Sequence, residues 1–208
     1  PRDRRQRQMC IRDRLYSVSE ERFITQKEAD SGDFRDVREL KEKNYFFKMS
    51  KYQSRLIKHI NDNPTFIQPE HRRNEVLGFL RSPLEDLCIS RPKNRLNWGI
   101  EIPFDKKYVT YVWFDALINY VSAIGYQSDE KKYNTFWPVN FHLIGKDILT
   151  THSVYWPTML MSAELPLPKG IFAHGWWLSD QNKMSKSLGN VVDPIDLIDS
   201  YGVDPIRF

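Results

Sequence analysis

The octet KMSKSLGN, residues 183–190, brings together groups that bind phosphate well. Its two lysines carry flexible ammonium groups, Ser185 adds a hydroxyl, and Gly189 lets backbone amides approach a ligand. At about 4 Å and an effective dielectric constant of 20, each charge contact contributes on the order of 4 kcal/mol before desolvation. Lys183 and Lys186 could therefore offset the charge that develops on a triphosphate during attack at its α-phosphorus. The competing interpretation is a solvated basic loop.

A second candidate is the tripeptide Gly145, Lys146 and Asp147, which the pattern places between a strand and a helix. Glycine permits close approach of backbone to a ligand, and the amides of a helix N-terminus favour anions. An ordinary turn with Asp147 as the helix cap explains the same residues equally well.

Two apolar stripes follow at helical spacing. Ile148, His152, Tyr155 and Met159 share one face, and Trp113 precedes Leu117 and Tyr120 at similar spacing. An aromatic and aliphatic lining with a few polar groups suits a pocket for a small apolar side chain. Packing in the core is the alternative for both stripes.

The elements that would carry these residues alternate between strands and helices. We expect strands over residues 108–114, 139–145 and 170–178, with helices over 115–126, 147–163 and from Pro194, where Asp193 is the expected cap. This alternation predicts an α/β fold with parallel strands, whose carboxyl ends would gather Asp115, residues 145–147 and residues 174–177. Upstream, we expect helices over 50–62, capped by Ser50, and over 69–82, ended by Pro83; residues 15–47 suggest a small meander.

Charge and composition exclude several classes of protein. The chain has 208 residues, 40% of them hydrophobic, and a formal net charge of +4. No run is long and apolar enough for a membrane helix, and no secretory signal is present, so we expect a cytoplasmic protein without a membrane partner. Cys88 is the only cysteine after residue 14, which argues against a disulfide or a thiolate zinc site.

The excess of positive charge lies entirely in residues 1–14, which hold six arginines and two aspartates. Residues 4–13 are similar to the translation of a transposon-type sequencing adapter, so we interpret residues 1–14 as non-native sequence. Basic and acidic residues balance in the remainder. That balance gives no support to DNA binding or to strong independent RNA binding.

Eight segments occur together in an order typical of one family. They are NYFFKMSKYQ, RRNEVLGFLR, ISRP, YVTYVWFDALINYVSAIGY, WPVNFHLIGKDI, HSVYWPTMLM, FAHGWW and KMSKSLGNVVDP. With them, residues 15–208 resemble the methionyl-tRNA synthetases, which are class I aminoacyl-tRNA synthetases. The resemblance implies the second half of a Rossmann-like catalytic domain in residues 89–208, with part of the connective insertion in residues 15–88.

The resemblance also implies a reaction and a role for each candidate residue. Methionine and ATP, with Mg²⁺, would give methionyl-adenylate and pyrophosphate, and the methionyl group would then move to the methionine tRNA. The methionine pocket would be Trp113, Leu117, Tyr120, Ile148 and His152. Asp147 and Arg91 would order the reacting centre, Gly145, His174, Gly175 and Trp176 would surround the adenosine, and Lys183, Ser185 and Lys186 would hold the phosphates.

Three departures from the family pattern limit the expected activity. The first signature segment, of the His-x-Gly-His type, has no counterpart, and neither does the helical anticodon-reading domain. Ser17 and Glu20 stand where many relatives carry a zinc-binding Cys-x-x-Cys, so we expect no zinc. We therefore expect an internal piece of a synthetase that is inactive by itself. The alternatives are a leucyl-, isoleucyl-, valyl- or cysteinyl-tRNA synthetase, or a noncatalytic module that binds tRNA or a protein partner.

Overall fold

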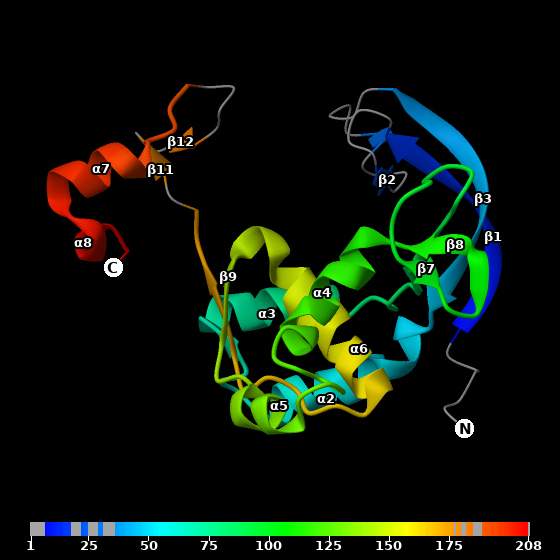
Figure 1. Ribbon diagram of the computed structural model, residues 1–208, viewed down its shortest axis with the longest axis horizontal. Coiled ribbons are helices and arrows are strands. Elements are labelled where there is room, and N and C mark those ends of the chain that lie inside the picture. Colours follow the sequence, from blue (N-terminus) through cyan, green and yellow to red (C-terminus); the bar gives the residue numbers. More distant parts are fainter. Residues whose placement is uncertain are drawn as a thin grey trace.

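A parallel sheet of three strands positions most of the candidate residues. The structure is a computed structural model that describes residues 7–17, 22–24, 29–30, 36–176, 178–179, 182–184 and 189–207. The sheet has the order β4 (Ile67–Gln68), β10 (Ile171–His174), β9 (His142–Gly145), and helices pack around it (Figure 1). His174 pairs with Gly145, so these two carboxyl ends lie side by side. The expected α/β class and the strands over 139–145 and 170–178 are confirmed, although both strands are shorter; β4 was not expected.

One helix precedes β4 and another follows it. A 3-10 turn, η2 (Met49–Tyr52), leads into α2 (Gln53–Asp62), and α3 (Glu70–Phe79) follows β4. Both helices were expected, but Ser50 does not cap the first. Its hydroxyl donates instead to the Asp86 carboxylate at 2.7 Å, and its backbone N–H donates to the same oxygen at 3.2 Å. This tie to the segment after α3 keeps Ser50 in the 3-10 turn, and α2 begins at Gln53.

The expected strand over residues 108–114 is wrong in its extent and in its sheet. The strand β8 (Asp105–Thr110) ends early and lies in an antiparallel sheet, between β6 (Ser90–Pro92) and β7 (Glu101–Ile102). Residues 112–114, the end of the expected strand, instead form the first turn of helix α4 (Val112–Ser122). Asp115 consequently lies within α4 and not at the end of a parallel strand.

The single helix expected over residues 147–163 is divided into three parts. These are the 3-10 turn η3 (Lys146–Ile148), the π-helical turn η4 (Thr151–Tyr155) and α6 (Trp156–Ala163). Pro157 has no N–H to donate to the carbonyl of Ser153, so a regular hydrogen-bond ladder cannot cross this point. The N–H of Trp156 donates to Thr151, five residues back, as in a π-turn.

The chain after β10 leaves the parallel sheet. The short strands β11 (Leu178–Ser179) and β12 (Asn182–Lys183) form a hairpin, and α7 (Pro194–Tyr201) and α8 (Val203–Arg207) follow it. In Figure 1 this part, coloured orange to red, extends away from the helices around the sheet. Asp193 accepts from the N–H of Ile195 at 2.8 Å, which confirms it as the cap of α7.

An antiparallel sheet lies on the other side of the molecule, in the order β2 (Arg22–Ile24), β1 (Arg7–Ser17), β3 (Val37–Phe47), β5 (Leu87–Cys88). The expected meander is wrong in its order, because β3 pairs with β1 and not with β2, and β1 and β3 are longer than that expectation. The backbone of β1 pairs with β3 from residue 7 onward. The interpretation of residues 1–14 as non-native sequence stays a prediction.

One continuous core joins the helices to the parallel sheet. Its members come from both expected regions, so residues 15–88 and 89–208 pack against each other. The large side chains with less than 2% exposure are Trp156, Phe46, Phe66, Leu56, Ile60, Ile67, Leu80, Leu160, Ile171, Val109, Val154 and Thr158. Helix α5 (Glu130–Phe136), which was not expected, has no buried residue. The described helices include none with the length and apolar character needed to span a membrane.

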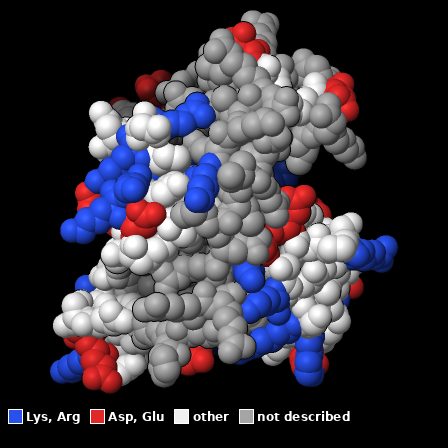
Figure 2. Space-filling view, turned by 90° about the vertical axis from the view of Figure 1, so that its right-hand side faces the viewer, with Lys and Arg blue, Asp and Glu red and all other residues white. Residues whose placement is uncertain are grey.

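Charges of both signs lie close together on the surface. Figure 2 shows the face that carries the long antiparallel ribbon, where described basic and acidic side chains stand near one another. Among the residues that the structure describes, ion pairs join Lys58 to Asp62, Arg72 to Glu75 and Lys93 to Glu101. Pairs of this kind, largely exposed to water, contribute little to stability.

Candidate active site

Gly145 and His174 form the centre of the strand-end group. A Cβ atom built on Gly145 would lie 2.5 Å from Oδ1 of Asp147 and 3.8 Å from Cε1 of His174. The space that a Cβ would fill is therefore occupied by the Asp147 carboxylate, which would have to move if a larger residue stood at position 145. Gly175 follows in open space, with no heavy atom within 4 Å of an added Cβ. These four predicted residues thus meet at one edge of the sheet.

Lys146, the middle residue of the candidate tripeptide, lies beside this group, although the family resemblance gave it no role. Its ammonium nitrogen is 3.8 Å from the centre of the Trp176 ring, a cation–π contact. Trp176 is 42% exposed, so one large aromatic side chain remains accessible next to the strand ends.

Tyr120 and His152 form a second group, farther inside. The Tyr120 hydroxyl and Nε2 of His152 are 2.8 Å apart, and Nδ1 of His152 lies 3.0 Å from the carbonyl oxygen of Ile148. A carbonyl only accepts, so Nδ1 carries the proton and Nε2 accepts from the tyrosine. Leu117 is 3% exposed and packs in the same core. Tyr120, Ile148 and His152 are thus brought together, and Leu117 lies three residues before Tyr120 in α4.

Burial keeps both polar members of this group neutral. Desolvation lowers the pKa of His152, an effect that the hydrogen bond with Ile148 partly opposes. Desolvation also raises the pKa of Tyr120. At neutral pH the pair is a phenol that donates to an imidazole, without a net charge. Such a lining, whose donors are already bonded within the protein, is compatible with an apolar ligand.

His142 and Trp156 complete the inner cluster, and sequence reasoning missed both. The indole Nε1 of Trp156 donates to Nε2 of His142 at 3.2 Å. Desolvation, with a smaller contribution from His152, lowers the pKa of His142 to about 4. No signal in the sequence indicates this residue, because His142 is buried with Ile144 on one face of β9 while the apolar Leu143 is exposed.

Arg91 and Trp113 lie at a different place, along a cavity of about 640 Å³. The Arg91 guanidinium lies 4.1 Å from the centre of the Tyr111 ring and donates to the carbonyl of Ser90 at 3.0 Å. Trp113 is half exposed at the start of α4. Tyr155 and Thr151 line the same cavity, while the neighbouring His152 contacts Tyr120. Tyr155 therefore does not join the inner group.

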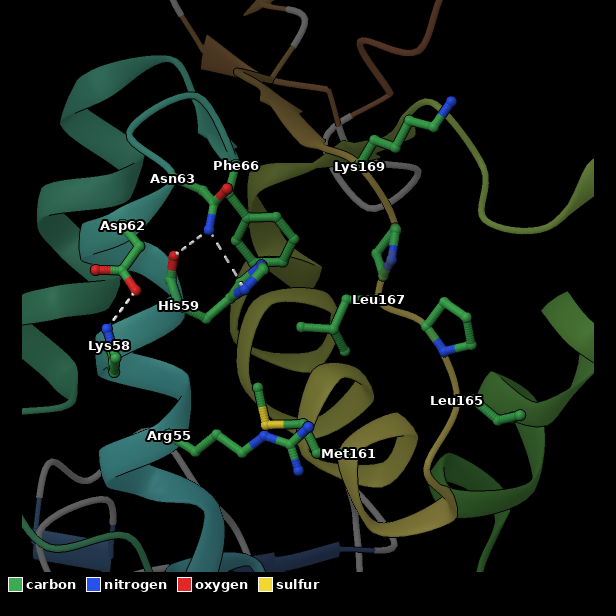
Figure 3. Close-up of a pocket in the computed structure, with 12 residues that line it drawn as sticks. Arg55, Lys58, His59, Asp62, Asn63, Phe66, Met161, Leu165, Leu167 and Lys169 are labelled. Carbon is green, nitrogen blue, oxygen red and sulfur yellow. Dashed lines mark hydrogen bonds and ion pairs between the residues drawn. The ribbon is translucent and has the colours of Figure 1, made fainter.

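A further cavity of about 580 Å³ lies at the opposite, amino-terminal ends of the strands (Figure 3). It is lined by α2, by the segment before β10, and by Phe66 and Met161. His59 contacts Phe66 edge to face, with ring centres 4.6 Å apart. Ligands of open α/β sheets gather at the carboxyl ends, so this cavity is not the candidate site.

Part of the phosphate-binding prediction lies outside the described residues. Ser185 and Lys186 are not described, and of Lys183 only the backbone is, where it pairs with Leu178. Within the described part of the chain, no group of three or more His, Cys, Asp or Glu side chains could hold a metal ion. The expected absence of zinc stays a prediction, because Glu20 and its neighbours are not described.

Comparison with known proteins places this arrangement in a family. The model of the class I (M) tRNA synthetases matches residues 17–208, and the chain belongs to that family. A methionine–tRNA ligase of Clostridium acetobutylicum is 56% identical over 192 residues, which cover 91% of this chain and 29% of the relative. A methionine–tRNA ligase of Rickettsia conorii is 50% identical over 199 residues, covering 93% and 38%.

The fold agrees with a solved structure of the same kind. The Mycobacterium tuberculosis methionyl-tRNA synthetase in complex with methionyl-adenylate has a TM-score of 0.86 and 41% identity, covering 97% of this chain and 41% of that one. The expected Rossmann-like class I synthetase fold is confirmed. The chain spans 29% and 38% of the two curated relatives.

Proposed function

We propose that this chain forms part of a methionine–tRNA ligase, which activates methionine with ATP and transfers the methionyl group to the methionine tRNA. The observation that carries the proposal is the inner cluster around Tyr120 and His152, directly beside the strand ends at Gly145 and His174. A neutral cluster of mostly apolar side chains, near the edge where the nucleotide is proposed to lie, suits an apolar amino acid that reacts with ATP. The named relatives and the adenylate-bound neighbour point the same way.

In this proposal the methionine side chain lies against Leu117, Tyr120, Ile148 and His152, whereas Trp113, which lies along the separate cavity, would have to move to reach it. The thioether is a weak hydrogen-bond acceptor, and the neutral hydroxyl and imidazole place no buried charge beside it. A charged pair at the same place would have to be desolvated whenever the ligand bound. Selectivity for methionine would then come from shape and from this neutral lining.

The nucleotide would lie across Gly145, His174, Gly175 and Trp176. Gly175 leaves room for close approach, and the exposed ring of Trp176 offers a stacking surface. Lys183, Ser185 and Lys186 would hold the phosphates, and Mg²⁺ would accompany ATP. Asp147 and Arg91 would orient the reacting groups. The methionine carboxylate then attacks the α-phosphorus, and pyrophosphate leaves.

A segment exchange tests the proposal without relying on the isolated chain. Residues 17–208 would replace the matching segment of the Clostridium acetobutylicum ligase, which supplies the remainder of that protein. We expect the chimera to catalyse methionine-dependent exchange between ATP and pyrophosphate, and to charge methionine tRNA. Leucine and isoleucine should give no exchange above background. A chimera that unfolds cooperatively but activates leucine, or no amino acid, would contradict the proposal.

A cytoplasmic location, as expected from the sequence, is part of the same proposal. It would be tested by following a tagged form of the protein in cell fractions.

A further inference from the structure

We propose that His142 is a positioning residue, which holds Trp156 and through it the Tyr120–His152 pair in the orientation that the methionine side chain needs. This inference rests on the proposed function. It assigns no contact between His142 and the substrate.

The hydrogen bond between Trp156 and His142 fixes both partners. An indole N–H only donates, so Nε2 of His142 must accept, and the proton of the neutral ring lies on Nδ1. Trp156 is 2% exposed and His142 is 5% exposed. Without the imidazole acceptor, the indole N–H would be buried without this partner, and the ring would turn toward another acceptor.

The rings next to this bond are those of the predicted pocket. The centre of the His142 ring lies 4.4 Å from that of Tyr120 and 5.8 Å from that of His152. Trp156 also contacts Tyr120, with ring centres 6.0 Å apart. A turn of Trp156 would therefore displace the phenol that donates to His152.

The position of Trp156 in the chain strengthens this coupling. It begins α6 directly after the π-turn that carries His152, and its N–H closes that turn by donating to Thr151. The indole also packs against Trp137, with ring centres 6.0 Å apart. A shift of Trp156 is thus transmitted to the backbone of the pocket as well as to Tyr120.

His142 also connects the two parts of the proposed site. It lies on β9, three residues before Gly145, and Gly145 pairs with His174 at the carboxyl end of the strand. The same short strand therefore carries the group that orients the pocket and the glycine next to the proposed nucleotide. If His142 only filled space, any side chain of the right volume would serve at position 142. The test therefore compares substitutions with and without a hydrogen-bond acceptor.

The experiment uses the chimera described above and measures KM for methionine and for ATP separately. His142→Phe fills the space without an acceptor, His142→Gln retains an acceptor, and Trp156→Phe removes the donor. The matched control is His71→Gln, on the exposed surface of α3. Thermal unfolding of each variant checks that it is folded.

We expect His142→Phe to raise KM for methionine about ten-fold, with KM for ATP unchanged. The KM for methionine of His142→Gln should stay within about three-fold of the parent value. The double variant that combines His142→Phe with Trp156→Phe should have a KM for methionine no higher than that of the more impaired single variant. His71→Gln should equal the parent. An equal rise in both KM values, an effect on kcat alone, or additive effects would overturn the inference.

A second measurement does not depend on the variants. The imidazole ¹⁵N shifts of His142 in the parent chimera should show a protonated Nδ1 and an accepting, unprotonated Nε2. A proton on Nε2 would overturn the inference even if His142→Phe failed to fold. A folded parent without methionine activation would instead overturn the proposed function, and this outcome is seen before any variant is made.

Discussion

The hydroxyl of Tyr120 donates to Nε2 of His152, whose Nδ1 donates in turn to the carbonyl of Ile148. Every polar atom of the imidazole is thereby used, and its tautomer follows from its partners. The same bond joins α4 to the π-turn before α6, two elements that are distant in the sequence. Their relative placement is therefore sensitive to this single hydroxyl.

Removal of that hydroxyl should weaken methionine binding selectively. Tyr120→Phe leaves the ring in place but leaves Nε2 of His152 without its donor, which costs about 1 kcal/mol or somewhat more. We expect a rise of roughly five- to ten-fold in KM for methionine and no change in KM for ATP, measured by pyrophosphate exchange in the chimera. Tyr201→Phe, on the exposed surface of α7, is the matched control. Equal effects on both substrates would argue against a methionine pocket here.

The free energy of unfolding should fall as the pH drops from 6.5 to about 4. In this range a buried histidine of the folded chain stays neutral, while the same histidine in the unfolded chain binds a proton. The pKa of His142 is lowered from 6.5 to about 4, so the unfolded chain takes up a proton that the folded one refuses. The stability that neutral His142 contributes to the folded state is fully present above pH 6.5 and is lost as the pH falls toward 4. Its size is on the order of 3 kcal/mol. His152 acts in the same direction, because its pKa is also lowered.

Urea unfolding at pH 7.5 and at pH 4.5, followed by tryptophan fluorescence, measures this dependence. The difference in unfolding free energy between the two pH values should shrink in His142→Gln. It should remain in His71→Gln, whose wild-type side chain is exposed. The comparison between variants is required, since carboxylates with a lowered pKa, such as Glu101 beside Lys93, add an acid dependence of their own. If His142→Gln retained the full difference, the histidine would not be the cause.

Two glycines offer opposite outcomes for the same substitution. Gly145→Ala would place a Cβ 2.5 Å from the Asp147 carboxylate, whereas Gly78→Ala meets nothing within 4 Å. Gly78 lies in α3, where alanine favours the helix by up to about 1 kcal/mol. We expect Gly78→Ala to raise the unfolding free energy without affecting exchange. Gly145→Ala should lower the exchange rate at least ten-fold, because the carboxylate must move. Unchanged activity in Gly145→Ala would show that exchange does not require the Asp147 carboxylate to stay where it lies in this structure.

The sequence was sufficient for the strands that end at Gly145 and His174, because each is a short apolar run followed by glycine or a polar turn. It was also sufficient for the cap at Asp193, which depends only on neighbouring residues. The cluster members Tyr120, Ile148 and His152 were found by helical spacing together with the family resemblance. Local signals and motif order therefore carried most of the correct predictions.

The remaining features depend on contacts between distant residues. The side chain of Ser50 has the chemistry of a cap, yet it binds Asp86, which lies 36 residues later. Residues 108–114 are rich in strand formers, but tertiary packing ends β8 at Thr110 and begins α4 at Val112. The partnership of His142 with Trp156 requires the fold itself, because neither residue type signals the other in a linear sequence.

The two lysines of the octet should act on the rate more than on methionine binding. If Lys186 stabilises charge that develops on the phosphates, Lys186→Ala in the chimera should lower kcat of exchange about 100-fold, with KM for methionine changed less than three-fold. Lys183→Ala should act in the same direction. Lys107→Ala, in the antiparallel strand β8 and exposed, is the matched control and should equal the parent. A loss of methionine binding with kcat intact would show that the octet shapes the pocket instead of holding the triphosphate.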